Sequence, residues 1–235
     1  NRLLQGEVGS GKTVVALLAM LQVLDAGRQC VMLAPTEVLA VQHHRSLTAM
    51  LGDLGERGRL GAADEATRVV LLTGSMSTAQ RRAALLDIVT GEAGIVVGTH
   101  ALIQDSVDFF DLGLVVVDEA YVHFNVDPDA ARGIDFFRAY PNVVVLHTFS
   151  KAYGLAGLRI GYAISPDYIS AALRAVAIPF GVTNLAQQAA LASLAAESEV
   201  EERITALVEQ RDHVHQRLTE QGWDVVESQA NFGWL

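Results

Sequence analysis

The chain has 235 residues, of which 51% are hydrophobic and 19% are charged, and its formal net charge is −10. This length can bury a substantial core in one large or two modest domains, and no apolar run of about 18 residues is free of polar breaks. The acidic balance argues against broad, sequence-independent nucleic-acid binding, because phosphate contacts need clustered Lys and Arg. We therefore expect a soluble globular protein with no membrane partner.

The single cysteine, Cys30, lies in an apolar run. One cysteine excludes an internal disulfide and fits a reducing compartment, so we expect a core side chain and a cytoplasmic location. The chain begins at Asn1 without a start methionine or a charged-then-apolar leader, and it stops in the apolar pair Trp234–Leu235. We interpret both ends as cut.

Short apolar strands alternate with helical patterns in chain order. Strands are predicted at Leu3–Leu4, Cys30–Leu33, Val69–Leu72, Ile95–Val97, Leu114–Val117, Asn142–Leu146, Arg159–Ile164 and Asp224–Glu227. Helices are predicted at Val14–Leu24, Glu37–Met50, Thr78–Val89, Asp127–Arg138, Ser165–Val176 and Asn184–Glu220, the last broken near Glu197–Ser198. This alternation is typical of an α/β fold with a doubly wound, mostly parallel sheet.

A glycine-rich loop connects the first predicted strand to the first predicted helix. It has the spacing Gly-x4-Gly-Lys-Thr, in which backbone N–H groups converge on phosphate oxygens. Lys12 would neutralise the terminal phosphates of ATP and Thr13 would hold Mg²⁺. The alternative is a glycine-rich turn without a ligand. The predicted nucleotide-binding residues are Gly6, Gly9, Ser10, Gly11, Lys12 and Thr13.

An acidic pair ends the apolar strand Leu114–Val117. Asp118 would bind the Mg²⁺ of a nucleotide together with Thr13, and Glu119 would orient the attacking water as a catalytic residue. Both residues follow a buried strand, which is where ligands of parallel sheets lie.

Residues 1–119 closely resemble the first, RecA-like motor lobe of RecG-type ATP-dependent DNA helicases. The resemblance lies in LQGEVGSGKT at Leu4–Thr13, PTEVLA from Pro35, LTGS at Leu72–Ser75 and GTHALIQ at Gly98–Gln104. It implies that Thr36, Thr73 and Thr99 line a DNA backbone track, so weak DNA contact is expected. After Glu119 the family pattern is lost and the second motor lobe is missing. We therefore expect slow ATP turnover at best.

The chain has 15 Arg and only two Lys. The two are Lys12 and Lys151, and each lies inside one of the motifs described here.

Residues 115–235 resemble class I/II aminotransferases dependent on pyridoxal 5′-phosphate, most closely the histidinol-phosphate type. The resemblance lies in VDEAYVHF at Val117–Phe124, LHTFSKAYGLAGLRIGY at Leu146–Tyr162 and SQANF at Ser228–Phe232. Residues 115–221 would be a large-domain fragment and 222–235 the start of a truncated small domain.

The aminotransferase resemblance implies a role at the cofactor for each of six residues. Lys151 would bind the cofactor covalently and move the α-proton, while Asp118 would pair with the pyridinium nitrogen. Tyr121 would hydrogen-bond the ring 3-oxygen, and the phosphate would contact Thr148, Ser150 and Arg159. Regions that complete the site in this family are missing, and the family's homodimer shares its active site, so a homodimer is implied but no measurable transamination is expected.

Both readings use Asp118, which cannot hold Mg²⁺ and a pyridinium together, so the two ligands should compete. We expect one continuous sheet in which Asn142–Leu146 lies beside Leu114–Val117. Three hypotheses remain open: a nucleotide-binding lobe with a foreign C-terminal half, a cofactor-binding aminotransferase fragment, and an artificial or misassembled hybrid without activity. The pairs His43–His44 and His213 with His215 lack the spacing of a helical metal pair, so we expect surface histidines.

Overall fold

The computed structural model describes residues 2–4, 11–55, 66–99, 102, 107–128, 130–177 and 179–233. Within them the chain forms one seven-stranded sheet in the order β1-β7-β6-β5-β2-β4-β3. The strands are β1 (Arg2–Leu4), β2 (Gln29–Leu33), β3 (Arg68–Leu72), β4 (Ala93–Gly98), β5 (Leu112–Asp118), β6 (Val143–Thr148) and β7 (Gly161–Ile164). The five strands from β6 to β3 are parallel, and β7 is antiparallel to both of its neighbours. The predicted mostly parallel α/β sheet is confirmed.

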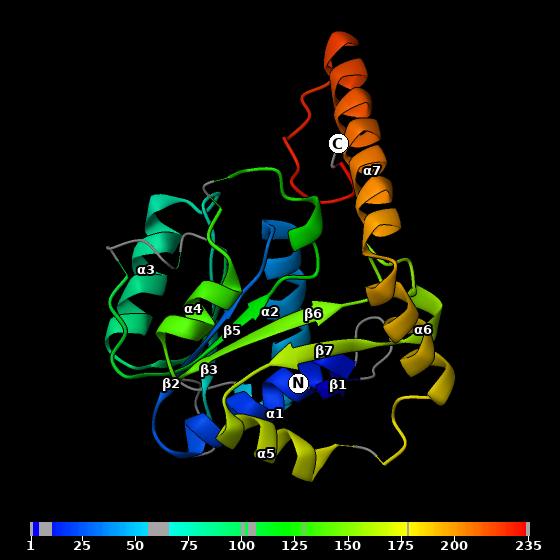
Figure 1. Cartoon of the computed structure of the whole chain (residues 1–235). Coiled ribbons are helices and arrows are strands. Elements are labelled where there is room, and N and C mark those ends of the chain that lie inside the picture. The colour runs from blue at the N-terminus through cyan, green and yellow to red at the C-terminus, as the bar shows by residue number, and fades with distance from the viewer. Residues whose placement is uncertain are drawn as a thin grey trace.

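Helices cover both faces of this sheet (Figure 1). They are α1 (Gly11–Asp25), α2 (Glu37–Leu51), α3 (Thr78–Val89), α4 (Gly133–Ala139), α5 (Asp167–Val176), α6 (Asn184–Ala195) and α7 (Glu197–Glu220). Helices α1, α2 and α5 contribute to one apolar core, and α3 contributes to the core on the opposite face. Of the helices in the described part of the chain, none is long and apolar enough to cross a membrane.

The two cores arise from the alternation of side chains along each strand. In β2, Cys30 and Met32 belong to the core with α1 and α2, whereas Val31 and Leu33 belong to the core with α3. All four side chains are buried, as expected for a parallel strand with both faces covered. Cys30 is the buried core residue that was predicted, and burial raises the pKa of its thiol to about 12.

The sheet joins the N-terminal and C-terminal halves of the chain without a break. Strand β5 pairs with β2 on one side and with β6 on the other. Strand β1, the first of the chain, lies beyond β6 and β7 at the far edge, where it pairs with β7. Strands from the C-terminal half are therefore inserted between β1 and the remaining strands of the N-terminal half.

Two predicted elements differ from the structure. The helix predicted from Asp127 begins only at Gly133, whose N–H donates to the buried carboxylate of Glu119. Asp127 instead donates its N–H to the side chain of Asn125, which forms a local turn. The strand predicted at Asp224–Glu227 is reduced to a single bridge residue, Val226, in a segment that lies against α7 through a contact between His215 and the Val225 carbonyl.

Candidate functional site

The residues predicted to bind the pyridine cofactor follow two neighbouring strands. Asp118, the last residue of β5, pairs in register with Leu146 of β6. Because the strands are parallel, the segment after β6, which contains Ser150 and Lys151, leaves the sheet at the same edge as Asp118. The turn that carries Arg159 returns to this edge, since Gly161 at the start of β7 pairs with Thr148.

Lys151 and Tyr121 are in direct contact. The Nζ atom of Lys151 lies 4.8 Å from the centroid of the Tyr121 ring, within the range of a cation–π interaction. The Tyr121 ring also packs edge-on against the Phe232 ring, with 5.4 Å between the ring centroids. Phe232 belongs to the C-terminal segment, so the SQANF motif reaches the side chain that was predicted to bind the cofactor ring.

The hydroxyls and guanidinium predicted to hold a phosphate lie at the end of β6 and in the connection from β6 to β7. Thr148 is buried, and its hydroxyl oxygen accepts a hydrogen bond from the backbone N–H of Ser150 at 3.1 Å. Arg159 has a left-handed backbone with φ of 53°, and its side chain donates to the Ala156 carbonyl at 2.5 Å. A non-glycine residue in this conformation is strained, which is common at ligand sites.

His43 is a site residue that the sequence analysis missed. Its Nε2 atom lies 3.0 Å from Oδ2 of Asp118, and the two side chains are 14% and 13% exposed. The expectation that His43 is a surface histidine is therefore wrong. Asp118 also accepts a hydrogen bond from the Ala120 N–H through Oδ1 at 3.0 Å. The only sequence signal was a polar residue on the inner side of the α2 pattern.

Glu119 lies in a second hydrogen-bonded cluster. One carboxylate oxygen accepts from the Gly133 N–H, and the other lies 2.7 Å from Nε2 of His147. The remaining ring nitrogen of His147 lies 2.9 Å from the hydroxyl of Tyr162. Burial alone would raise the pKa of Glu119, but the hydrogen bonds from His147 and Gly133 outweigh it and hold the pKa below its ordinary value.

His123 lies beside this cluster, with its ring 6.2 Å from that of His147 and 5.3 Å from that of Tyr153. Burial lowers the pKa of His123, and the nearby His147 lowers it further. The same burial raises the pKa of Tyr153 and of Tyr162. The region around the carboxyl ends of β5 and β6 therefore favours neutral aromatic side chains around one anionic glutamate.

The three threonines predicted to line a DNA track follow β2, β3 and β4. Thr36 caps α2, since its hydroxyl accepts from the Leu39 N–H at 3.3 Å. Thr73 and Thr99 are both 3% exposed, and among the described residues the Thr99 hydroxyl has no hydrogen-bond partner. Glu37 accepts hydrogen bonds from the N–H and hydroxyl of Ser75 and so connects two of the three loops.

Of the six predicted nucleotide-binding residues, three lie outside the described residues, namely Gly6, Gly9 and Ser10. Gly11, Lys12 and Thr13 form the first backbone turn of α1, so the loop connects β1 to a helix N-terminus as predicted. Two strands separate β1 from β5, which puts the two strand axes roughly 14 Å apart at ordinary sheet spacing.

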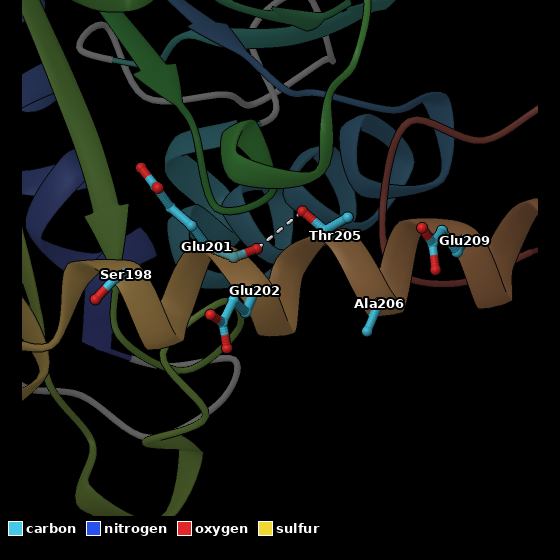
Figure 2. Close-up of a pocket in the computed structure, with 6 residues that line it drawn as sticks. All are labelled: Ser198, Glu201, Glu202, Thr205, Ala206 and Glu209. Atoms are coloured by element: carbon cyan, nitrogen blue, oxygen red, sulfur yellow. Dashed lines mark hydrogen bonds between the residues drawn. The ribbon is translucent and has the colours of Figure 1, made fainter.

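A shallow surface depression runs along helix α7 (Figure 2). It is lined by the residues Ser198, Glu201, Glu202, Thr205, Ala206 and Glu209. These residues recur at helical spacing and give one face of a single helix, in which the Thr205 hydroxyl donates to the Glu201 carbonyl. None of the predicted site residues lines this depression.

Sequence comparison places two families on this chain. The family model for DEAD/DEAH box helicases matches residues 1–137, and the model for class I and II aminotransferases matches residues 97–234. The chain belongs to both families. The two matches overlap at 97–137, which contains β5 with Asp118 and Glu119. The helicase-like half and the aminotransferase-like half therefore meet at β5, the strand that ends in Asp118.

Curated relatives of each half are similar over about half of this chain. The ATP-dependent DNA helicase RecG of Mycobacterium tuberculosis is 63% identical over 121 residues, which are 52% of this chain and 16% of the relative. The aromatic amino acid aminotransferase of Cutibacterium acnes is 62% identical over 122 residues, which are 52% of this chain and 35% of the relative. The chain thus spans about a sixth of one relative and about a third of the other.

The complete chain also has the fold of a solved aminotransferase. Histidinol-phosphate aminotransferase from Sinorhizobium meliloti aligns with 98% of this chain and 60% of its own length, at a TM-score of 0.57 and 23% identity. This similarity concerns the fold alone. It shows that the helicase-like strands and helices occupy positions compatible with an aminotransferase large domain.

Proposed function

We propose that this chain binds pyridoxal 5′-phosphate at Lys151 and ATP with Mg²⁺ at the loop from Gly6 to Thr13, without full helicase or transaminase activity. The observation that carries the proposal is the contact of Lys151 with Tyr121 at the carboxyl edge of two adjacent parallel strands, one of which ends in Asp118. Bound pyridoxal phosphate supplies an electron sink for reactions at the α-carbon of an amino acid.

The side chains are chemically suited to that cofactor. Asp118 is in contact with the Ala120 N–H and with His43, and its carboxylate would accept the pyridinium N–H of the cofactor. Lys151 supplies the amine that reacts with the cofactor aldehyde, and the ring of Tyr121 holds its ammonium group. Thr148, Ser150 and Arg159 would hold the phosphate, for which a guanidinium fork is suited.

The contacts of Glu119 support nucleotide binding with little hydrolysis. Glu119, proposed from the sequence to orient water for ATP hydrolysis, uses both carboxylate oxygens in contacts with Gly133 and His147. We propose that the Glu119 carboxylate acts in this chain as a hydrogen-bond partner that holds Gly133 and His147 in place. Because both of its oxygens are used in these contacts, we expect nucleotide to bind with little hydrolysis.

The experiment that tests cofactor binding uses the two lysines of the chain. The protein is incubated with pyridoxal phosphate, reduced with borohydride, and digested so that the modified peptide is identified by mass. We expect the adduct at Lys151, loss of the adduct in Lys151→Arg, and retention in Lys12→Arg. An adduct of equal yield on both lysines would mean that the cofactor site is not formed.

A second candidate is a nucleotide-binding lobe alone, favoured by the strand β1, glycine loop and helix α1 in the order typical of phosphate loops. It predicts that Lys12→Ala abolishes binding of a fluorescent ATP analogue, while Lys151→Arg leaves it unchanged. We also propose two partners for the chain. One is DNA, in weak contact with Thr36, Thr73 and Thr99, and the other is a second copy of the chain, bound through the aminotransferase-like half.

Two further hypotheses of function make different predictions. A true aminotransferase, of the histidinol-phosphate or aromatic amino acid class, would transfer an amino group to 2-oxoglutarate and form glutamate at a rate proportional to enzyme concentration. A hybrid without a function, made by design or by faulty joining of two coding sequences, would bind neither ligand. Coupled assay of glutamate formation and the labelling experiment separate these readings from the proposed one.

A further inference from the structure

The contact between His43 and Asp118 joins a helix that only the helicase model matches to a residue that both family models match. His43 lies on α2, within the residues matched by the helicase model only, whereas Asp118 lies in the region matched by both. The two side chains are 3.0 Å apart and mostly buried. A hydrogen bond in such a place is stronger than one at the surface, because little water competes for either partner.

The geometry fixes the orientation of the Asp118 carboxylate. Oδ1 is held by the Ala120 N–H and Oδ2 by His43, so rotation of the carboxylate would break two hydrogen bonds. A ligand-binding side chain whose orientation is already fixed by a hydrogen bond gives higher affinity, because less conformational entropy is lost when the ligand binds.

The neighbouring histidine shows that the contact is specific to position 43. His44, on the same turn of α2, lies 3.2 Å from the Val69 carbonyl. The two histidines therefore differ in partner but share the helix, the residue type and partial burial. This gives a matched control within one turn.

We propose that His43 is a positioning residue for Asp118 in the pyridoxal phosphate site, supplied by the helicase-like half. The inference rests on the cofactor site proposed above. It means that the aminotransferase-like half does not form this site by its own residues, because one hydrogen bond to the cofactor's counter-ion comes from α2.

The test compares His43→Phe, His43→Gln and the control His44→Gln in the complete chain. Pyridoxal phosphate affinity is measured by titration of the bound-cofactor absorbance, and the adduct at Lys151 is measured after borohydride reduction. We expect His43→Phe to weaken affinity about tenfold, as supporting hydrogen bonds at ligand sites often do. Gln has an amide N–H near the position of Nε2, so His43→Gln should recover most of the affinity. His44→Gln should bind as the unsubstituted protein does.

The outcomes separate this inference from the proposed function. Absence of a selective adduct at Lys151 in the unsubstituted protein overturns the cofactor site and the inference together. A selective adduct in the unsubstituted protein with equal affinity in folded His43→Phe overturns the role of His43 alone. If His43→Phe does not fold, His43→Asn decides: its shorter amide places no N–H at the position of Nε2, so affinity should fall about tenfold. An unchanged affinity in this folded variant overturns the role of His43.

Discussion

The Nε2 atom of His43, on a helix that only the helicase model matches, lies 3.0 Å from Oδ2 of Asp118, in the region that both family models match. The strands show the same mixing, because β1 pairs with β7 and β5 lies between β2 and β6. Because β6 and β7 lie between β1 and the other helicase-like strands, neither half can be lost without exposing a strand edge of the other. We therefore expect the two halves to unfold together.

Two probes test this cooperativity. Cys30 in β2 is fully buried and reports on the helicase-like half through its reaction with a thiol reagent, which its pKa of about 12 suppresses while the chain is folded. Tryptophan fluorescence reports on the other half, in which Trp223 follows the end of α7. We predict coincident denaturant midpoints for both probes. Separate midpoints would show that the halves are independent units.

A core substitution in β6 extends that prediction. Val145 is fully buried, and Val145→Ala should destabilise the chain by about 1 to 3 kcal/mol through lost burial and the cavity left behind. Although Val145 lies in the aminotransferase-like half, the midpoint of Cys30 labelling should fall by the same amount as the midpoint of fluorescence. An unchanged Cys30 midpoint would contradict the single-sheet account.

Glu119→Ala should be among the more destabilising substitutions at the junction. It leaves the buried Gly133 N–H and the His147 ring without their acceptor, and an unsatisfied buried donor costs about 1 to 3 kcal/mol. Urea unfolding at neutral pH measures the loss. Glu209→Ala on the exposed face of α7 is the control, for which a change within about 0.5 kcal/mol is expected.

Stability should fall as the pH is lowered from neutral. Burial lowers the pKa of His123 below its ordinary 6.5, so the unfolded chain binds this proton more readily than the folded one. The stabilisation is present above pH 6.5 and is lost as the pH falls through the lowered pKa. Glu119, whose pKa is below 4.5, adds loss in the same direction at still lower pH.

Melting temperatures between pH 8 and pH 5 measure this dependence. His123→Gln should flatten the decline that begins near pH 6.5, because the side chain that becomes protonated is removed. The exposed His213, substituted in the same way, should leave the decline as it is. An equally steep decline in His123→Gln would assign the pH dependence to other groups.

Local sequence signals predicted most of the elements. Helix α3 has the predicted bounds, because Ser77 and Gln80 form a reciprocal capping box at its start. The break between α6 and α7 occurs at Ala196, next to the predicted position. Asp118 and Lys151 were predicted from motifs, and the structure brings the strands that carry them side by side.

Features that depend on long-range packing could not be predicted in this way. The contact of His43 with Asp118 spans 75 positions and needs the order β5-β2 of the sheet. The start of α4 is set by the distant Glu119, which accepts from Gly133, whereas Pro128 alone favoured an earlier start. The place of β1 beyond β7 likewise follows from pairing that no local pattern encodes.

The central claim is that both halves form one site region in which Asp118 is contested by two ligands. The most direct measurement is pyridoxal phosphate labelling with borohydride reduction and peptide mapping, done with and without Mg–ATP. We predict a selective adduct at Lys151 that Mg–ATP suppresses, because Asp118 cannot bind Mg²⁺ and a pyridinium together. Simultaneous and independent saturation by both ligands, or labelling divided equally between Lys12 and Lys151, would contradict this account.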